Sequence, residues 1–127
     1  MSLRHGDTHF SIKGKIIIAT LTGAYNKNGA IQYTEGIKSI VKSFKGERYA
    51  ILVDNTDMEG GTPEAYQVLE EYNQWLNNTN LVAKAIVSNT TITTDIIKSL
   101  SPSINLQKNM HFEDKETAMT WVKKILS

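Results

Sequence analysis

The sequence predicts one α/β domain spanning residues 1–127, with a mixed, mainly parallel five-stranded sheet and four helices. The length of 127 residues suits a single hydrophobic core. Short runs of apolar and β-branched residues alternate with segments whose apolar residues recur every three or four positions. The resulting order is β-β-α-β-α-β-α-β-α. Such alternation requires crossover connections and hence parallel strands, whereas the opening hairpin adds one antiparallel strand.

Five segments have the composition of strands. Gly14 lies in a tight turn between the first two, and glycine supplies the positive φ that such a turn needs. The second strand is almost continuously apolar, which indicates burial on both faces. The predicted strands cover residues 9–12, 16–21, 49–53, 81–87 and 109–112.

Four segments carry the apolar stripe of a helix. Gly46 is expected to end the first one as a left-handed cap. The second has the clearest start, with Thr62 as N-cap, Pro63 at the first position and Glu64 in the first turn. The predicted helices cover residues 30–44, 63–76, 94–100 and a final stretch whose stripe runs through residues 118–125.

Composition narrows the function classes. The formal net charge is +1 and the lysines are scattered, so we expect no nucleic-acid partner. The absence of cysteine excludes disulfides and thiolate metal sites. The apolar runs fall short of the ~20 residues that cross a bilayer, and no leader precedes them, so we expect a cytoplasmic protein without stable membrane insertion. No cofactor is expected.

The segment between the third strand and the second helix is predicted to be an acidic, glycine-containing loop. Ligands and partners of open α/β sheets dock beyond the carboxyl ends of the strands. We therefore expect a partner-binding or regulatory site there. Its predicted residues are Asp54, Asn55, Thr56, Asp57, Gly61, Thr62 and Tyr66, the last as an exposed anchor. Tyr25 and Ser88 follow other strands at the same sheet edge and are predicted to line a pocket.

Thr62 has two interpretations. It caps a helix, which is worth ~1 kcal/mol, or it accepts a phosphate, which the positive end of a helix would stabilise. Asp54, Asp57 and Glu59 could bind magnesium through carboxylates and water, although acids in turns more often accept bonds from nearby backbone amides. The sequence predicts no catalytic residue and no metal ligand.

The chain resembles the STAS domain, and more narrowly the SpoIIAA-like family of small bacterial proteins, the fold of the anti-sigma-factor antagonists. The resemblance rests on the opening hairpin, on the strand that ends in Asp54, and on the ending from Met110 to Val122, in which acids precede an Ala-x-x-Trp-Val helix. In antagonists a phosphorylatable serine begins the next helix; Thr62 is the hydroxyl residue at the matching place, but the acid-serine-serine-glycine signature is absent. The resemblance implies a docking surface around this segment.

Three hypotheses for function follow. The leading one is a non-enzymatic regulatory module that presents residues 54–62 and the next helix to a protein partner, with a second copy of the chain as a further candidate. The alternative is a carrier of an apolar, lipid-like ligand, which a suggested kinship of the family with lipid-binding folds implies. The third is a hydrolase that uses Asp54 and Asp57.

Overall fold

The computed structural model describes residues 5–127. Its elements follow in the order β1 (Asp7–Lys13), β2 (Ile16–Tyr25), α1 (Lys27–Ser43), β3 (Tyr49–Gly61), α2 (Pro63–Leu76), β4 (Leu81–Val87), α3 (Thr91–Leu100), the 3-10 helix η1 (Pro102–Leu106), β5 (Asn109–Phe112) and α4 (Lys115–Leu126). The five strands form one sheet in the spatial order β1-β2-β3-β4-β5. β1 and β2 are antiparallel and all other neighbours are parallel, which confirms the predicted fold class.

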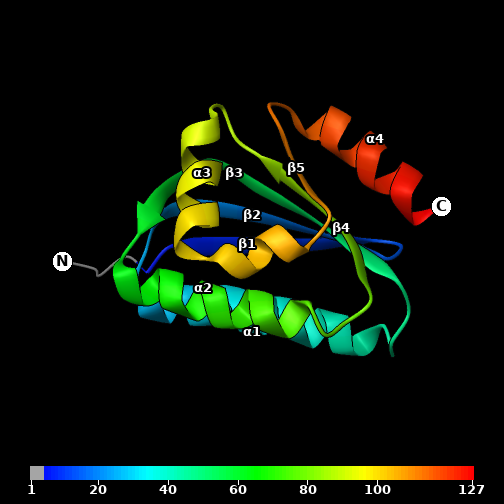
Figure 1. Ribbon diagram of the computed structural model, residues 1–127, viewed down its shortest axis with the longest axis horizontal. Coiled ribbons are helices and arrows are strands. Elements are labelled where there is room, and N and C mark those ends of the chain that lie inside the picture. The colour runs from blue at the N-terminus through cyan, green and yellow to red at the C-terminus, as the bar shows by residue number, and fades with distance from the viewer. Residues whose placement is uncertain (1–4) are drawn as a thin grey trace.

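Helices cover both faces of this sheet. Figure 1 shows α1 and α2 running together along one face and α4 on the opposite face. α3 and η1 follow β4 and pack beside α2, where they extend the first helical layer. The sheet is therefore the middle of three layers, with one apolar core on each side.

The alternation of side chains along β3 shows how both cores form. Ile51 and Val53 point into the core under α1 and α2, while Ala50 and Leu52 point into the core under α4. All four are buried, because a strand sandwiched between two helical layers needs apolar residues on both faces. This is the physical reason for the unbroken apolar runs in the sequence.

The prediction of an acidic loop after residue 53 is wrong, because β3 continues through this segment to Gly61. Backbone pairing with β2 extends this far, from Thr20 beside Asp54 to Tyr25 beside Gly61, and β2 is correspondingly longer than predicted. Two register shifts interrupt the pairing, and such irregularities re-aim side chains. Pairing of β3 with β4 stops at Asp54, so the extension has a neighbour on one side only. The polar residues are compatible with a strand because this part is not sandwiched.

Two helices, α1 and α3, begin earlier than predicted from their apolar stripes. Asn26 caps α1 by accepting a hydrogen bond from the Gly29 amide, 2.9 Å away. Thr90 caps α3 in the same way, through the Ile92 amide at 3.2 Å. Caps set helix starts independently of the stripe, and the stripe alone therefore placed both starts about a turn late.

Candidate functional site

The rim is defined here as residues 54–62 together with Tyr66, at the end of the sheet where α2 begins. Thr56, Asp57 and Glu59 are exposed along the β3 extension. Asp54 is half-buried, and one of its carboxylate oxygens accepts bonds from Thr56, at 3.0 Å from the backbone amide and 2.6 Å from the hydroxyl. The first acid of the rim therefore bonds within its own strand. Within residues 5–127, no three His, Asp or Glu side chains converge as metal ligands.

Thr62 is the N-cap of α2, as predicted. Its hydroxyl oxygen accepts a hydrogen bond from the Ala65 amide at 3.2 Å, and its own amide donates to the Tyr25 carbonyl at 2.9 Å. Pro63 follows at the start of the helix, and Thr62 itself is exposed. Thr62 thus links the end of β2, the end of β3 and the start of α2, while its side chain remains accessible from outside.

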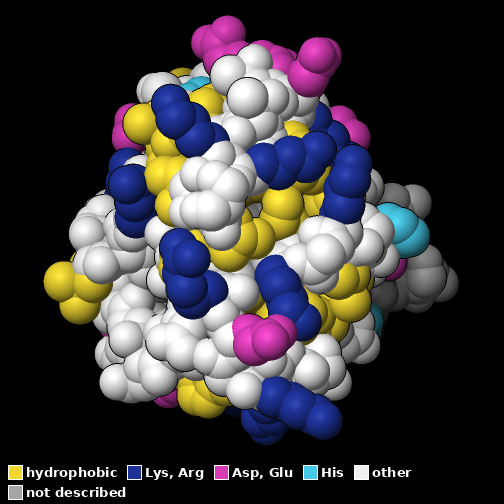
Figure 2. Space-filling model, turned by 90° about the vertical axis from the view of Figure 1, so that its right-hand side faces the viewer, with side chains coloured by type: hydrophobic (Ala, Val, Ile, Leu, Met, Phe, Trp, Pro, Cys, Tyr) yellow, Lys and Arg dark blue, Asp and Glu magenta, His cyan; other side chains and the backbone are white. Residues whose placement is uncertain are grey.

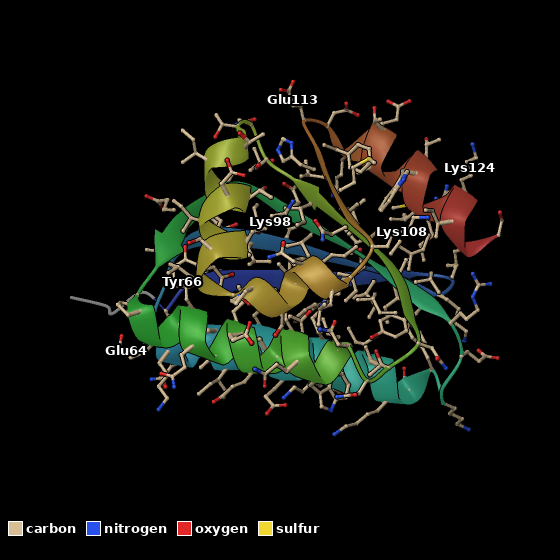
Figure 3. The ribbon with its side chains drawn as sticks, viewed as in Figure 1. Glu64, Tyr66, Lys98, Lys108, Glu113 and Lys124 are labelled. Atoms are coloured by element: carbon tan, nitrogen blue, oxygen red, sulfur yellow. The ribbon has the colours of Figure 1, made fainter. Side chains whose placement is uncertain are left out.

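The prediction that Tyr66 is an exposed anchor is wrong, because its side chain is half-buried. Figure 3 shows Tyr66 on the side of α2 that faces the sheet and α3, whereas Glu64 points away from the body of the molecule. Burial raises the pKa of the Tyr66 phenol, and a hydrogen bond with the backbone of Gly61 partly opposes this rise. Tyr66 belongs to the wall of a cavity rather than to the outer surface.

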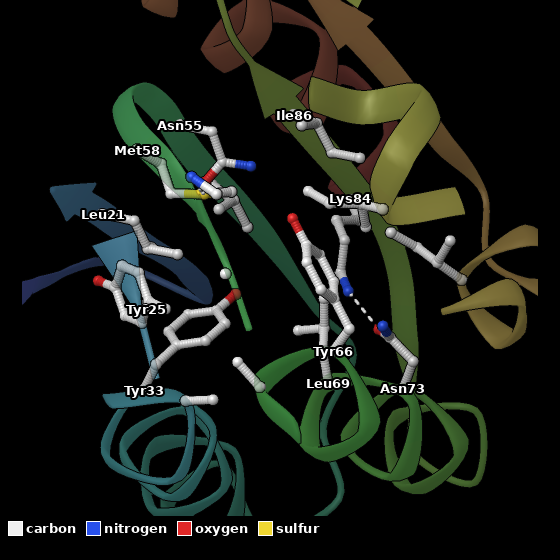
Figure 4. A pocket seen from close by; sticks show the side chains of 17 residues that line it. Leu21, Tyr25, Tyr33, Asn55, Met58, Tyr66, Leu69, Asn73, Lys84 and Ile86 are labelled. Carbon is white, nitrogen blue, oxygen red and sulfur yellow. Dashed lines mark hydrogen bonds between the residues drawn. The ribbon is translucent and has the colours of Figure 1, made fainter. Parts of the chain in front are cut away.

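An apolar cavity lies between the sheet and the layer formed by α1, α2, α3 and η1, with a volume of about 60 Å³ (Figure 4). The apolar side chains that line it are Leu21, Tyr25, Ala30, Tyr33, Val53, Met58, Ala65, Tyr66, Leu69, Ile86, Ile97 and Ile104. Gly60, Gly61, Asn55, Asn73 and Lys84 complete the lining. Gly61 is exposed, and Met58, Gly60 and Tyr66 are half-buried. The rim therefore forms the outer wall of the cavity.

The two predicted pocket residues, Tyr25 and Ser88, lie in different places, and only Tyr25 lines the cavity. Tyr25 lines the cavity, but it ends β2 rather than lying in a loop, and its hydroxyl donates to the Asp7 carbonyl at 2.6 Å. Burial raises the pKa of this phenol. Asn55 also lines the cavity, whereas Ser88 is buried beside β5 and Asp54 bonds Thr56, so neither contributes to the lining.

Lys84 also lines the cavity, and it is not among the site residues predicted from the sequence. It lies in the middle of β4 with only 2% of its surface exposed, and its ammonium donates to the Asn73 side-chain oxygen at 2.8 Å. The same nitrogen lies 5.2 Å from the centre of the Tyr72 ring. Desolvation lowers the pKa of Lys84 to about 7. A single charged residue inside an apolar strand was the available sequence signal.

Asn73 connects Lys84 to the helices that close the cavity. Its amide nitrogen donates to the Ser101 hydroxyl at 2.9 Å, and its oxygen also accepts from Gln107 at 3.1 Å. Glu70, one turn earlier on α2, accepts from the Ser103 amide at 2.9 Å and from the Ser103 hydroxyl at 2.6 Å. These bonds hold η1 and the end of α3 against α2.

Ser88 and His111 lie close together but do not form a nucleophile and base. The Ser88 hydroxyl donates to the Thr90 carbonyl at 2.6 Å. The Nε2 atom of His111 lies 2.9 Å from the Ser88 hydroxyl oxygen and 3.1 Å from the Ser88 carbonyl, an acceptor only. Nε2 therefore carries the hydrogen, and this ring nitrogen cannot take a proton from the serine. The pair fixes β5 to the end of β4.

The end of the molecule opposite the rim is rich in cations. Figure 2 shows lysine and arginine side chains around apolar patches on this end, where α4 finishes. The neighbouring Lys13 ammonium lowers the pKa of Lys123. Lys15 forms an ion pair with Glu47 at 2.7 Å. Separately, no helix within residues 5–127 has both the length and the apolar content that crossing a bilayer requires.

Comparison with known proteins establishes the fold. No protein-family model matches the sequence, and neither does any curated protein. An uncharacterised DUF3478-family protein with a SpoIIAA-like fold from Shewanella loihica PV-4 superposes with a TM-score of 0.70 at 17% identity, over 96% of this chain and 98% of that one. An anti-sigma factor antagonist from Mycobacterium paratuberculosis gives 0.65 at 14% identity, over 93% and 94%. Unphosphorylated SpoIIAA, also an anti-sigma factor antagonist, gives 0.64 at 13% identity, over 95% and 100%. The chain has the SpoIIAA-like, STAS-type fold.

Proposed function

We propose that this SpoIIAA-like chain is a non-enzymatic regulatory module that binds a protein partner at its rim. The observation that carries the proposal is the position of Thr62, an exposed hydroxyl at the start of α2 beside the acidic end of β3. The likeness of fold to anti-sigma factor antagonists supports this choice of function class. Exposed Thr56, Asp57 and Glu59 give the surface a negative charge that a partner can read.

Charge at Thr62 is the proposed control. A phosphate there would lie at the positive end of α2, where an anion is stabilised, but also near Asp57 and Glu59, which repel it. The modified rim would present a different potential to the partner while the fold stays the same. A second copy of this chain is one candidate partner for the rim.

The test compares Thr62→Glu with Thr120→Glu in quantitative affinity capture from extracts of the source organism. Thr120 is exposed on α4, on the other face of the sheet, so its substitution adds the same charge away from the rim. We expect wild type and Thr120→Glu to retain the same set of proteins and Thr62→Glu to lose at least one of them. Identical sets for all three proteins would remove the proposed control, and no reproducible protein on wild type would remove the partner.

Binding of a small apolar ligand is a second candidate function, which the cavity specifically favours. Clefts with apolar walls and a few polar groups are typical ligand sites, and this one contains Lys84 and Asn55 among apolar side chains. Native mass spectrometry of freshly purified protein tests for a co-purified ligand. Because the rim forms the outer wall of the cavity, a ligand there would lie directly behind the proposed docking surface.

A further inference from the structure

We infer that the cavity binds an acyl carboxylate, a ligand with an apolar chain and one anionic head, and that Lys84 is the counter-ion of that head. Asn55 supplies the second polar contact. The inference rests on the second candidate function, binding of an apolar ligand, and names the chemical class of that ligand. Two buried polar groups with unused hydrogen-bonding capacity carry it.

Lys84 is the first of these groups. An ammonium has three N–H donors, and in the described part of the chain the only acceptor bonded to this one is the Asn73 side-chain oxygen at 2.8 Å. That oxygen is shared with the Gln107 amide, 3.1 Å away. Within residues 5–127 the one ion pair joins Lys15 to Glu47, so the described chain offers Lys84 no carboxylate partner. A buried cation normally has a counter-ion, and here the cavity is the space in which one can bind.

Asn55 is the second group and comes from a different strand. It is 96% buried on β3, since only 4% of its surface is exposed, and it lines the same cavity. Among the residues that the structure describes, its side-chain oxygen has no hydrogen-bond partner. Most buried polar atoms in proteins are paired, so an unpaired amide at a cavity wall indicates a group that a ligand completes. A carboxylate only accepts hydrogen bonds, so the Asn55 carboxamide must bind the head through its NH₂ group, after a rotation of about 180° that exchanges the positions of its oxygen and nitrogen.

The charge and size of the site favour a carboxylate. One ammonium matches one carboxylate, whereas a phosphate monoester carries close to two charges and three acceptor oxygens. The remaining walls are apolar and suit a hydrocarbon chain. The volume of about 60 Å³ is below the ~150 Å³ of a cavity that holds benzene. The head and first carbons therefore fill the present space, and the rest of the chain passes the outer wall at Gly60, Gly61 and Tyr66.

Binding of the carboxylate should also be coupled to uptake of a proton by the Lys84 amine. Desolvation holds the pKa of Lys84 at about 7, so much of the amine is neutral at pH 8, and a bound carboxylate would restore its charge. The titratable groups that face it or line the cavity are Tyr25 on β2, Tyr33 on α1 and Tyr66 and Tyr72 on α2, and burial raises the pKa of each phenol. Glu70 is separated from it by Asn73 and Ser101. The other lining residues on β3, α3 and η1 are uncharged.

Isothermal titration calorimetry at pH 8 tests the inference with octanoate and, as a neutral probe of the same length, 1-octanol. The proteins are wild type, Lys84→Met and Lys42→Met, the last removing the same charge from an exposed position on α1. We expect wild type and Lys42→Met to bind octanoate at least tenfold more tightly than octanol. Lys84→Met should bind octanoate at least tenfold more weakly and still bind octanol. Titrations in buffers of different ionisation enthalpy should show proton uptake with octanoate alone.

The outcomes separate this inference from the function on which it rests. Equal binding of both probes, unchanged in Lys84→Met, would overturn the carboxylate and leave apolar-ligand binding standing. Binding of neither probe by wild type would overturn both. If Lys84→Met fails to fold, the ¹³Cε resonance of Lys84 in wild type decides. A shift toward the protonated amine with octanoate but not with octanol supports the inference, and no such shift overturns it.

Discussion

The burial of Lys84 destabilises the folded protein. Removing an ammonium from water costs several kcal/mol, and a hydrogen bond to one neutral acceptor offsets only part of this penalty. Asn73 is that acceptor, and the Tyr72 ring adds a weaker attraction. A buried charge without a counter-ion is therefore a position where an apolar side chain would give a more stable protein.

Replacing Lys84 by methionine should stabilise the protein below pH 7 by about 1–4 kcal/mol. Methionine has a similar stem, and the Asn73 oxygen keeps its bond from Gln107. The gain should shrink as the pH rises above 7. There the folded lysine has already lost its proton, whereas the unfolded one holds it up to its ordinary pKa of 10.5. The unfolded state thus binds more protons, and the stability of wild type rises relative to the variant by up to about 1.4 kcal/mol per pH unit.

Urea unfolding at pH 6, 7.5 and 9 measures this difference. Lys42→Met, with an exposed lysine removed, should show a difference from wild type that does not change over the same range. A constant difference between Lys84→Met and wild type would contradict the burial of a titrating amine.

The residues of the cavity could be predicted only in part. Tyr25 and Asn55 were expected at this end of the sheet because both follow apolar strand residues, and both line the cavity. Tyr66 was assigned to the outer surface because its position lies off the main stripe of α2. α3 and η1 cover that side of the helix, and their packing depends on contacts that no periodicity encodes. The sequence does not single out Lys84, because a strand pattern tolerates one polar residue without indicating which face it takes.

At the level of elements, the sheet and helices follow from patterns, whereas the β3 extension does not. Apolar runs indicate β2, β3 and β4, since parallel strands buried on both faces cannot be built otherwise. β1 and β5 lie at the edges of the sheet and are more exposed. Residues 54–61 carry acids and glycines typical of loops, and their pairing with β2 is made by the backbone, which leaves no side-chain signal. The sequence also gives no indication of η1, because a five-residue 3-10 helix is too short to show an apolar stripe.

Gly36, in the middle of α1, provides a prediction at this level. A Cβ atom there would lie 2.5 Å from two carbons of the Phe10 ring, which packs across the helix from β1. Alanine would gain ~1 kcal/mol in helix propensity, but overpacking costs about 1–3 kcal/mol. We expect Gly36→Ala to destabilise the protein slightly in chemical denaturation.

A double-mutant cycle isolates the cause. Phe10→Leu should also destabilise, because it removes the ring that stacks on Tyr33. The double variant should lose less stability than the sum of the single losses, since leucine leaves room for the new methyl group. Additive losses would show that Gly36 is needed for a reason other than Phe10.

At the level of the whole molecule, the rim and the cavity share one wall. Met58, Gly60, Gly61 and Tyr66 separate the apolar interior from the exposed acids. Gly60 has a φ of +97°, a conformation that favours glycine. A ligand chain longer than the present cavity must displace this wall, whereas the core under α4 lies beyond the sheet. Occupancy inside the protein would therefore be felt first at the proposed docking surface.

Hydrogen–deuterium exchange with octanoate tests this arrangement. Saturating octanoate should change amide protection in the end of β3 and the first turn of α2, by a few-fold in exchange rate, and leave β1 and α4 as they were. Lys84→Met at the same octanoate concentration provides the control. A change spread evenly over all elements, or confined to α4, would contradict the shared wall.

The spatial order of the strands repeats their order along the chain. During synthesis each strand can join a neighbour that has already left the ribosome, so the sheet can grow in one direction without waiting for a distant partner. The cavity cannot close so early, because Ile97 and Ile104 come from α3 and η1, after β4 has been made. The nascent chain therefore exposes the apolar interior, with Lys84 in it, until these two helices emerge and cover it.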